Sequence, residues 1–249
     1  MTADPTRRLV LAHGFTQTAR SWTDVAGLLA TRLPEVATLA VDLPGHGACA
    51  VSADADLGAS AAHLVALGGP AIYVGYSMGG RVALHAALER PDAVRGLVLI
   101  GATAGIDDPA ERAARRSADE ALAARIEQIG VEAFLDEWLA NPLFAGLTAE
   151  AAQRDDRLRN SARGLASSLR HTGTGTQEPL WNRLEEIDVP ALIIAGENDP
   201  KFRALGERLR TRLRNATIAV VPDAGHTVHL EQPAAAVDVI AAWWRSHFD

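Results

Sequence analysis

The chain has 249 residues, of which 48% are hydrophobic and 22% are charged, and its formal net charge is −7 at pH 7. This composition is typical of a globular protein, and the length suits one large domain or a core that carries an insertion. The negative charge argues against a nucleic-acid-binding protein and against one that adsorbs to anionic lipid.

Cysteine content and hydropathy exclude further classes. Cys49 is the only cysteine, so the chain has no internal disulfide and no thiolate metal site, and a small loop residue is the simplest interpretation of it. No run approaches the roughly 18 apolar residues that span a bilayer, and the polar start of the chain lacks the apolar stretch of a secretory signal. We therefore expect a cytoplasmic protein without membrane insertion.

Short apolar runs alternate with helical patterns along most of the chain. In chain order the pattern predicts a strand at 8–11, a helix at about 21–32, a strand at 37–41, a helix ending near residue 68, a strand at 71–74, a helix at 80–88, a strand at 97–100, a strand at 191–195, a helix at about 202–213, a strand at 218–221 and a helix at about 234–247. Apolar strands alternating with amphipathic helices are typical of a parallel sheet with helices on both faces. The sequence therefore predicts an α/β fold.

Residues 101–190 interrupt this alternation. From 109 to about 169 the pattern is nearly all helical, with a break at Asn141 and Pro142, and a glycine-threonine loop follows at 173–176. A helical insertion between two strands of a parallel sheet lies over the carboxyl ends of the strands, where such sheets bind ligands. We predict a core of 1–105 and 182–249, with 106–181 as a helical cap.

The most informative motif is Gly75-Tyr76-Ser77-Met78-Gly79, which lies between a predicted strand and a predicted helix. At such a junction the turn is too tight for bulky neighbours, and the serine hydroxyl is held above the sheet edge beside the positive end of the helix. Ser77 is therefore the candidate nucleophile or proton relay.

A serine hydroxyl needs a base, and the base needs an orienting acid. Asp199 and His226 each follow a predicted strand, and they come after Ser77 in the order that this arrangement requires. Glu197 stays open as a substitute acid. Three other residues rank lower: Asp223 shares the loop of His226, Asp188 precedes its strand, and His229 is expected to pack against or cap the last helix.

Two backbone N–H groups are expected to form an oxyanion hole. One belongs to Met78, after the serine, and the other to Phe15, in the loop after the first strand, where Gly14 permits a close backbone approach. His13 is expected to hold this loop from beneath by hydrogen bonds. The glycine-rich turn at 42–47 lacks the spacing of a phosphate-binding loop, so we interpret it as structural and predict no cofactor and no metal.

These motifs resemble the α/β-hydrolase superfamily over essentially the whole chain. The runs at 75–83, 42–47 and 196–202 are similar to those of the SHCHC synthase family of menaquinone biosynthesis, as are the cap segments at 111–116, 137–144 and 158–160. Proteins of the superfamily commonly have an antiparallel strand at one edge of the sheet. Little sequence precedes the first strand here, so the presence of that edge strand is left open.

The resemblance implies an α/β-hydrolase fold with a lyase activity. Members of the family eliminate pyruvate from 2-succinyl-5-enolpyruvyl-6-hydroxy-3-cyclohexene-1-carboxylate to give 2-succinyl-6-hydroxy-2,4-cyclohexadiene-1-carboxylate (SHCHC). Carried over by position, the implied substrate-binding residues are Arg81, Arg115, Trp138, Phe144 and Arg159. Tyr76, beside Ser77, is a further candidate.

The charges of that substrate agree with these arginines. The substrate carries three carboxylates, and arginine is suited to binding carboxylates with two hydrogen bonds. Arg81 lies one helical turn from Ser77 in an otherwise apolar helix. Arg115 and Arg159 have an alternative role, because arginines in an acidic helical cap commonly form solvated ion pairs.

Two rival functions remain. One is a serine hydrolase that uses the same triad covalently on a carboxylic ester or on a carbon–carbon bond next to a ketone, and the other is a ligand receptor on the same fold. The expected partner is a small polycarboxylate, and the expected assembly is a monomer or a small homo-oligomer.

Overall fold

The computed structural model describes residues 4–49 and 55–249. Within these residues six strands form one sheet in the order β2-β1-β3-β4-β5-β6, and every neighbouring pair is parallel. The strands are β1 (Arg8–Ala12), β2 (Ala37–Val41), β3 (Ala71–Tyr76), β4 (Val94–Ile100), β5 (Ala191–Gly196) and β6 (Ala216–Val221). The described part of the chain adds no antiparallel strand to this sheet.

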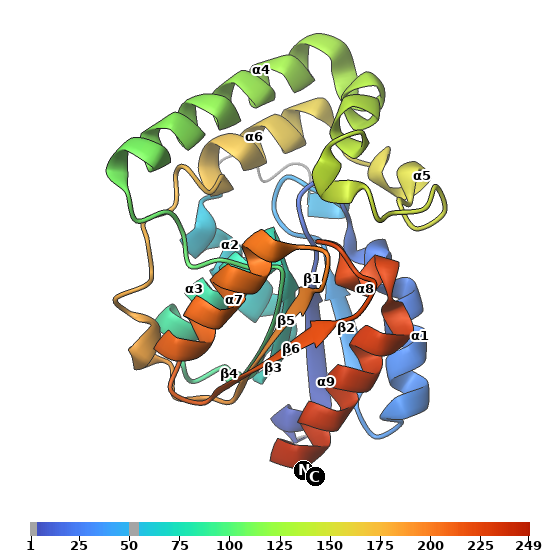
Figure 1. The fold of residues 1–249 in the computed structure, drawn as a ribbon, viewed down its shortest axis with the longest axis vertical. Coiled ribbons are helices and arrows are strands. Elements are labelled where there is room, and N and C mark those ends of the chain that lie inside the picture. The colour runs from blue at the N-terminus through green and yellow to red at the C-terminus, as the bar shows by residue number, and fades with distance from the viewer. Residues whose placement is uncertain (1–3, 50–54) are drawn as a thin grey trace.

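Helices cover both faces of the sheet (Figure 1). One face packs against α1 (Thr23–Arg32) and α9 (Pro233–Phe248), and the other against α2 (Leu57–Gly68), α3 (Met78–Glu89) and α7 (Pro200–Arg212). Successive strand residues point to opposite faces. In β1, Leu9 and Leu11 accordingly join the α1/α9 core, and Val10 and Ala12 join the α2/α3 core. The predicted α/β architecture is confirmed.

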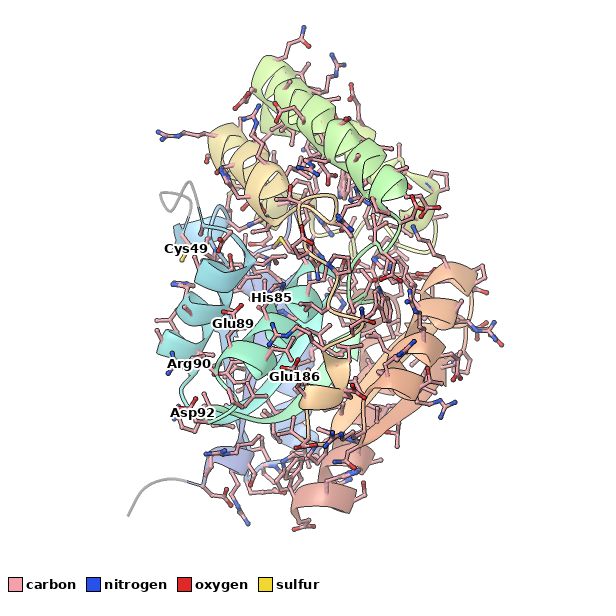
Figure 2. All side chains as sticks on the ribbon, turned by 90° about the vertical axis from the view of Figure 1, so that its left-hand side faces the viewer. Cys49, His85, Glu89, Arg90, Asp92 and Glu186 are labelled. Carbon is pink, nitrogen blue, oxygen red and sulfur yellow. The ribbon has the colours of Figure 1, made fainter. Side chains whose placement is uncertain are left out.

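A helical layer lies above the carboxyl ends of the strands, between β4 and β5 in the chain (Figures 1 and 2). It contains α4 (Pro109–Leu139), the short α5 (Arg154–Arg157) and α6 (Ala162–Thr172). Six residues of α4 and α6 form its apolar core: Ala123, Ile126, Phe134, Leu165, Ala166 and Leu169. Phe15, from the loop after β1, packs against this core, so the layer is anchored next to the predicted site.

The predicted break at Asn141 and Pro142 is confirmed, and the stretch without α-helix that begins there is longer than the pattern predicted. Asn141 accepts a hydrogen bond from the Leu143 N–H at 2.9 Å and caps a 3-10 turn at Pro142–Phe144. Turns follow, and Gln153 takes a left-handed conformation with a φ of 49°. Gly130 also kinks α4, with a φ of 79° that glycine adopts without strain.

The side of the molecule seen in Figure 2 carries pairs of polar side chains below the helical layer. His85 Nδ1 lies 3.2 Å from Glu89 Oε1, and Arg90 Nε lies 3.7 Å from Asp92 Oδ1. Cys49 lies in a 3-10 turn, Gly47–Cys49. None of these residues lines the cavity described below.

Over residues 4–49 and 55–249, no helix is both long enough and apolar enough to span a membrane.

Candidate active site

Ser77 occupies the sharp turn between β3 and α3. Its φ is 49° and its ψ is −105°, a strained conformation for a residue with a side chain. Its N–H donates to the Ile100 carbonyl at 2.8 Å, which ties the turn to the end of β4. A Cβ atom at Gly75 would meet the backbone of Gly79, and one at Gly79 would meet the backbone of Ala12, so both glycines are required by space.

Asp199 and His226 meet at the same edge of the sheet. His226 Nδ1 lies 2.9 Å from Asp199 Oδ2, and both side chains are buried. The other carboxylate oxygen of Asp199 accepts the Phe202 N–H at 3.1 Å and so caps α7. Burial raises the pKa of Asp199, but the hydrogen bonds from His226 and Phe202 outweigh it and leave the pKa below its ordinary value. The carboxylate is therefore ionised at neutral pH.

Because Nδ1 of His226 is bonded to Asp199, Nε2 is the ring nitrogen that can accept a proton from Ser77. Ser77 and His226 line the same cavity. The His226 ring is held by Phe202, with centroids 4.2 Å apart, and by Tyr76 at 5.3 Å. Gly101, with a φ of 54°, leaves room for it, because a Cβ there would lie 2.9 Å from His226 Cε1.

The alternative acids have other partners. Glu197 Oε2 accepts the Asp223 N–H at 3.3 Å, and Asp188 pairs with Arg214 at 2.9 Å. Asp199 is thus the carboxylate that the structure brings to His226.

The two amides expected for the oxyanion hole lie at the cavity wall. Phe15 and Met78 both line the cavity beside Ser77. Within the described residues, no acceptor is hydrogen-bonded to the backbone N–H of either one. Two unpaired N–H groups beside a serine, one of them at the N-terminus of α3, favour a developing negative charge.

Hydrogen bonds hold the oxyanion loop, residues 13–18, from beneath. His13 Nε2 accepts the Leu43 N–H at 3.0 Å. Asp42, in the glycine-rich turn, accepts the N–H groups of Ala19 at 2.6 Å and Ala48 at 2.8 Å. The structural roles predicted for His13 and for this turn are confirmed.

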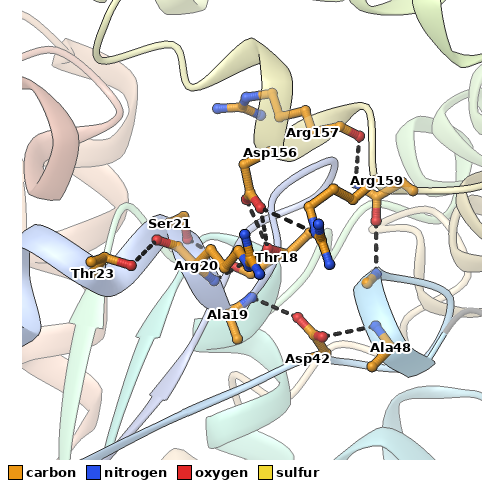
Figure 3. A network of polar contacts seen from close by, with 12 residues as sticks. Thr18, Ala19, Arg20, Ser21, Thr23, Asp42, Ala48, Asp156, Arg157 and Arg159 are labelled. Carbon is orange, nitrogen blue, oxygen red and sulfur yellow. Dashed lines mark hydrogen bonds and ion pairs between the residues drawn. The ribbon is translucent and has the colours of Figure 1, made fainter.

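The helical layer clamps the same loop from above through the clamp segment, residues 156–160. Thr18 donates to both carboxylate oxygens of Asp156 at 2.7 and 2.9 Å (Figure 3). Asn160 Nδ2 donates to the Thr16 carbonyl at 2.7 Å, and Arg157 Nη1 donates to the Thr16 hydroxyl. Thr16 has a φ of 67°, which is uncommon for a β-branched residue, so these bonds hold the loop in a strained shape.

Arg81 is buried in the cavity wall, with 7% of its surface exposed. Its Nη1 donates to two neutral acceptors, the Thr172 carbonyl at 2.6 Å and Gln177 Oε1 at 3.2 Å. Burial, with a smaller contribution from the nearby Arg115, lowers the pKa of Arg81 to about 10. The guanidinium therefore stays charged at neutral pH, and no carboxylate of the described residues forms an ion pair with it.

Four further candidates lie around the same cavity: Arg115, Trp138, Phe144 and Tyr76. Arg115 Nε donates to Asp119 at 2.8 Å, and its side chain is 44% exposed against 4% for Asp119. Trp138 packs between Phe144, Phe15 and Phe134, at centroid distances from 5.3 to 5.8 Å. The cavity thus combines an aromatic wall with cationic groups.

Among the predicted substrate-binding residues, Arg159 is the one that does not line the cavity. Its side chain is 53% exposed and lies 4.0 Å from Asp156 on the outer side of the clamp (Figure 3). Arg157, two residues earlier, is buried instead and points away from Arg159 in the same view. Position along the sequence could not distinguish them, because the choice depends on how α5 ends against the oxyanion loop.

His229, predicted to pack against or cap the last helix, is buried against two aromatic rings. It lies in α8 (Val228–Glu231), with its ring 4.5 Å from that of Trp22 and 4.4 Å from that of Tyr76. Burial lowers the pKa of His229 well below its ordinary value, so the ring is neutral.

Comparison with known proteins agrees with this geometry. Residues 9–239 match the model of the alpha/beta hydrolase family. A Bacillus subtilis protein named as a candidate 2-succinyl-6-hydroxy-2,4-cyclohexadiene-1-carboxylate synthase is 39% identical over 90% of this chain and 85% of that protein. The synthase of that name from Serratia proteamaculans is 34% identical over 91% of this chain and 89% of its own length.

A solved structure is similar throughout. MenH from S. aureus superposes with a TM-score of 0.89 and 30% identity, over 100% of this chain and 97% of that one. The chain therefore belongs to the alpha/beta hydrolase family, and its relatives within that family include the 2-succinyl-6-hydroxy-2,4-cyclohexadiene-1-carboxylate synthases.

Proposed function

We propose that the chain is an SHCHC synthase, a lyase of menaquinone biosynthesis that eliminates pyruvate from 2-succinyl-5-enolpyruvyl-6-hydroxy-3-cyclohexene-1-carboxylate. The observation that carries the proposal is Arg81, a buried guanidinium one helical turn from Ser77 whose bonds go to neutral groups. Such a cation favours an anionic substrate, because an apolar ester gains nothing from it. The identities of 34% and 39% to the synthases support the same reaction.

The first step is removal of the ring proton next to the succinyl ketone. Ser77 relays this proton to His226, and Asp199 stabilises the imidazolium that forms. Negative charge develops on the ketone oxygen, where the N–H groups of Phe15 and Met78 stabilise it. The resulting enolate is the intermediate from which the leaving group departs.

The second step expels the enolpyruvyl group. The electron pair returns from the enolate and forms the first new ring double bond, the existing ring double bond shifts by one position, and the carbon–oxygen bond to enolpyruvate breaks. The products are the 2,4-diene and enolpyruvate, which takes up a proton and becomes pyruvate. Serine acts throughout as a base relay, so no acyl-enzyme is needed.

The substrate-binding assignments follow from the lining of the cavity. Arg81 and Arg115 bind carboxylates, and Trp138, Phe144 and Tyr76 pack against the ring system. Residues 106–181 act as the cap that separates this chemistry from water. We also propose a cytoplasmic location, in keeping with a biosynthetic role, and a monomer or a small homo-oligomer as the assembly.

A serine hydrolase is the second candidate, because the triad and the unpaired amides are also complete machinery for acyl transfer. The decisive assay incubates the protein with the enolpyruvyl substrate and follows pyruvate release and the absorbance of the diene. Stoichiometric formation of both products supports the lyase. A burst with a p-nitrophenyl ester and a trapped acyl-Ser77, without pyruvate release, would establish the hydrolase instead.

Arg81→Gln tests the cation that carries the proposal. We expect kcat/KM to fall about 10- to 100-fold, because hydrogen bonds to charged groups contribute about 1.5–3 kcal/mol. Steady-state kinetics measure the change. Arg170→Gln is the matched control, since Arg170 pairs with Glu120 and Glu127 on the outside of the cap and does not line the cavity. Equal kcat/KM values for the two variants would contradict the role of Arg81.

A further inference from the structure

Lys201 is the only lysine in the chain, and it lies at the cavity wall. It occupies the first turn of α7, two residues after Asp199 and directly before Phe202. Phe202 in turn packs against the His226 ring, with centroids 4.2 Å apart. The ammonium therefore belongs to the side of the cavity that carries the acid and base of the triad.

The ammonium of Lys201 is available to a ligand, because it forms no ion pair within the described residues. Within residues 4–49 and 55–249, no carboxylate forms an ion pair with it. Its Nζ atom lies 5.8 Å from the centroid of the adjacent Phe202 ring. Arg115, the other exposed cation of the cavity, is by contrast paired with Asp119 at 2.8 Å.

We propose that Lys201 binds one carboxylate of the substrate and so determines the preference of the enzyme for a polycarboxylate. This inference rests on the proposed function. The cavity then supplies three cations, Arg81, Arg115 and Lys201, to the three carboxylates of the substrate. Arg159 does not line the cavity, and its side chain lies 4.0 Å from Asp156.

The chemistry of lysine suits this position. Its ammonium is a compact charge on a flexible four-carbon stem, so it reaches a carboxylate without the fixed geometry that a guanidinium needs. Because the side chain is exposed, the carboxylate does not have to lose its full hydration to bind. We therefore expect Lys201 to increase the affinity for the substrate modestly and to have little effect on the rate of the chemical step.

Lys201 could instead act on the triad through Asp199, and the two roles affect different kinetic constants. Lys201 is one of the groups that keep the pKa of Asp199 below its ordinary value, behind the hydrogen bonds from His226 and Phe202. If Lys201 acted only through the triad, its removal would change kcat and the pH profile of kcat. Binding of a carboxylate predicts a change in KM instead.

The kinetic test compares Lys201→Met, Lys201→Arg and the matched control Arg203→Met, measured by pyruvate release. Arg203 is an exposed cation two residues further along α7, and it does not line the cavity. We expect Lys201→Met to raise KM about three- to tenfold with kcat within about twofold. Arg should restore KM to within about threefold, and Arg203→Met should match the wild type. An unchanged KM, or a loss confined to kcat, overturns the proposal.

A binding test needs no turnover. Reductive methylation with ¹³C-formaldehyde labels the Lys201 amine and the α-amino group, so the NMR spectrum contains one side-chain signal. Tricarballylate, a small tricarboxylate, should shift the Lys201 signal saturably, and sodium chloride at equal ionic strength should not. A Lys201 signal that tricarballylate leaves in place overturns the proposal.

Failure of this inference and failure of the proposed function are distinguishable. If the protein releases no pyruvate but tricarballylate still shifts the signal, the reaction is wrong and Lys201 remains a carboxylate-binding residue. If pyruvate release is normal while KM and the signal are both insensitive, only the role of Lys201 is wrong.

Discussion

Ser77→Ala is expected to lower kcat for pyruvate release by at least about 10³-fold, because the members of a triad act as a unit and the remaining groups cannot replace the missing relay. Asp199 and His226 stay bonded to each other without the serine, since their 2.9 Å contact does not involve it. Substrate binding should change little, because the cationic groups of the cavity are untouched. Single-turnover kinetics with excess enzyme measure the chemical step directly.

The control for this substitution is a variant that removes a serine hydroxyl next to the cavity without touching the triad. Ser168→Ala serves, since Ser168 lines the cavity but bonds Thr172 at 2.9 Å and Met78 Sδ at 3.5 Å. Near-normal pyruvate release by the Ser77 variant would show that another group removes the proton.

Acidification is expected to destabilise the fold strongly between about pH 6.5 and pH 5. Burial lowers the pKa of His13 below its ordinary value, and it lowers the pKa of His46 and of His229 well below it. The unfolded chain therefore binds protons below about pH 6.5 that the folded chain does not. The free energy of unfolding is then highest above that pH and falls as the pH drops. Well below pH 6.5, the contribution of His46 and His229 together approaches a loss of about 2.7 kcal/mol per pH unit.

Urea unfolding at pH 7, 6 and 5 measures this slope. His46→Gln should flatten it by about 1.4 kcal/mol per pH unit, because one buried imidazole is gone. His247→Gln should leave it unchanged, since His247 is exposed near the end of α9. A free energy of unfolding that stays constant from pH 7 to pH 5 would show that these rings take up protons in the folded state.

The strands, the serine turn and the triad could be predicted because each rests on local sequence. Apolar runs define the strands, and residues that directly follow parallel strands meet at one edge of the sheet. Ser77, Asp199 and His226 lie in the connections after β3, β5 and β6, which is why chain order predicted that they meet. The glycines on either side of Ser77 were informative for the same reason, since space at a tight turn is a local property.

The clamp and the arginines of the cap could not be predicted in this way. Arg157 and Arg159 are alike in sequence, and the burial of Arg157 depends on tertiary contacts, with the Thr16 hydroxyl and the Ala152 carbonyl. Lys201 was missed for a different reason. It follows the triad acid at the start of a helix, where a charged residue is ordinarily just solvated.

The clamp also has a consequence for how the enzyme becomes active as it folds. The bonds that hold Thr16 and Thr18 come from residues about 140 positions later in the chain, so the strained loop that carries Phe15 has no support until that stretch has docked. Closing such long loops costs entropy before the contact is made, and the triad carries the same cost, because Ser77 and His226 are 149 residues apart in the sequence. The oxyanion hole therefore depends on the docking of the helical layer as well as on the sheet. Loss of the clamp bonds would leave Ser77, Asp199 and His226 in place and the oxyanion hole unformed, so activity would be lost while the triad remained.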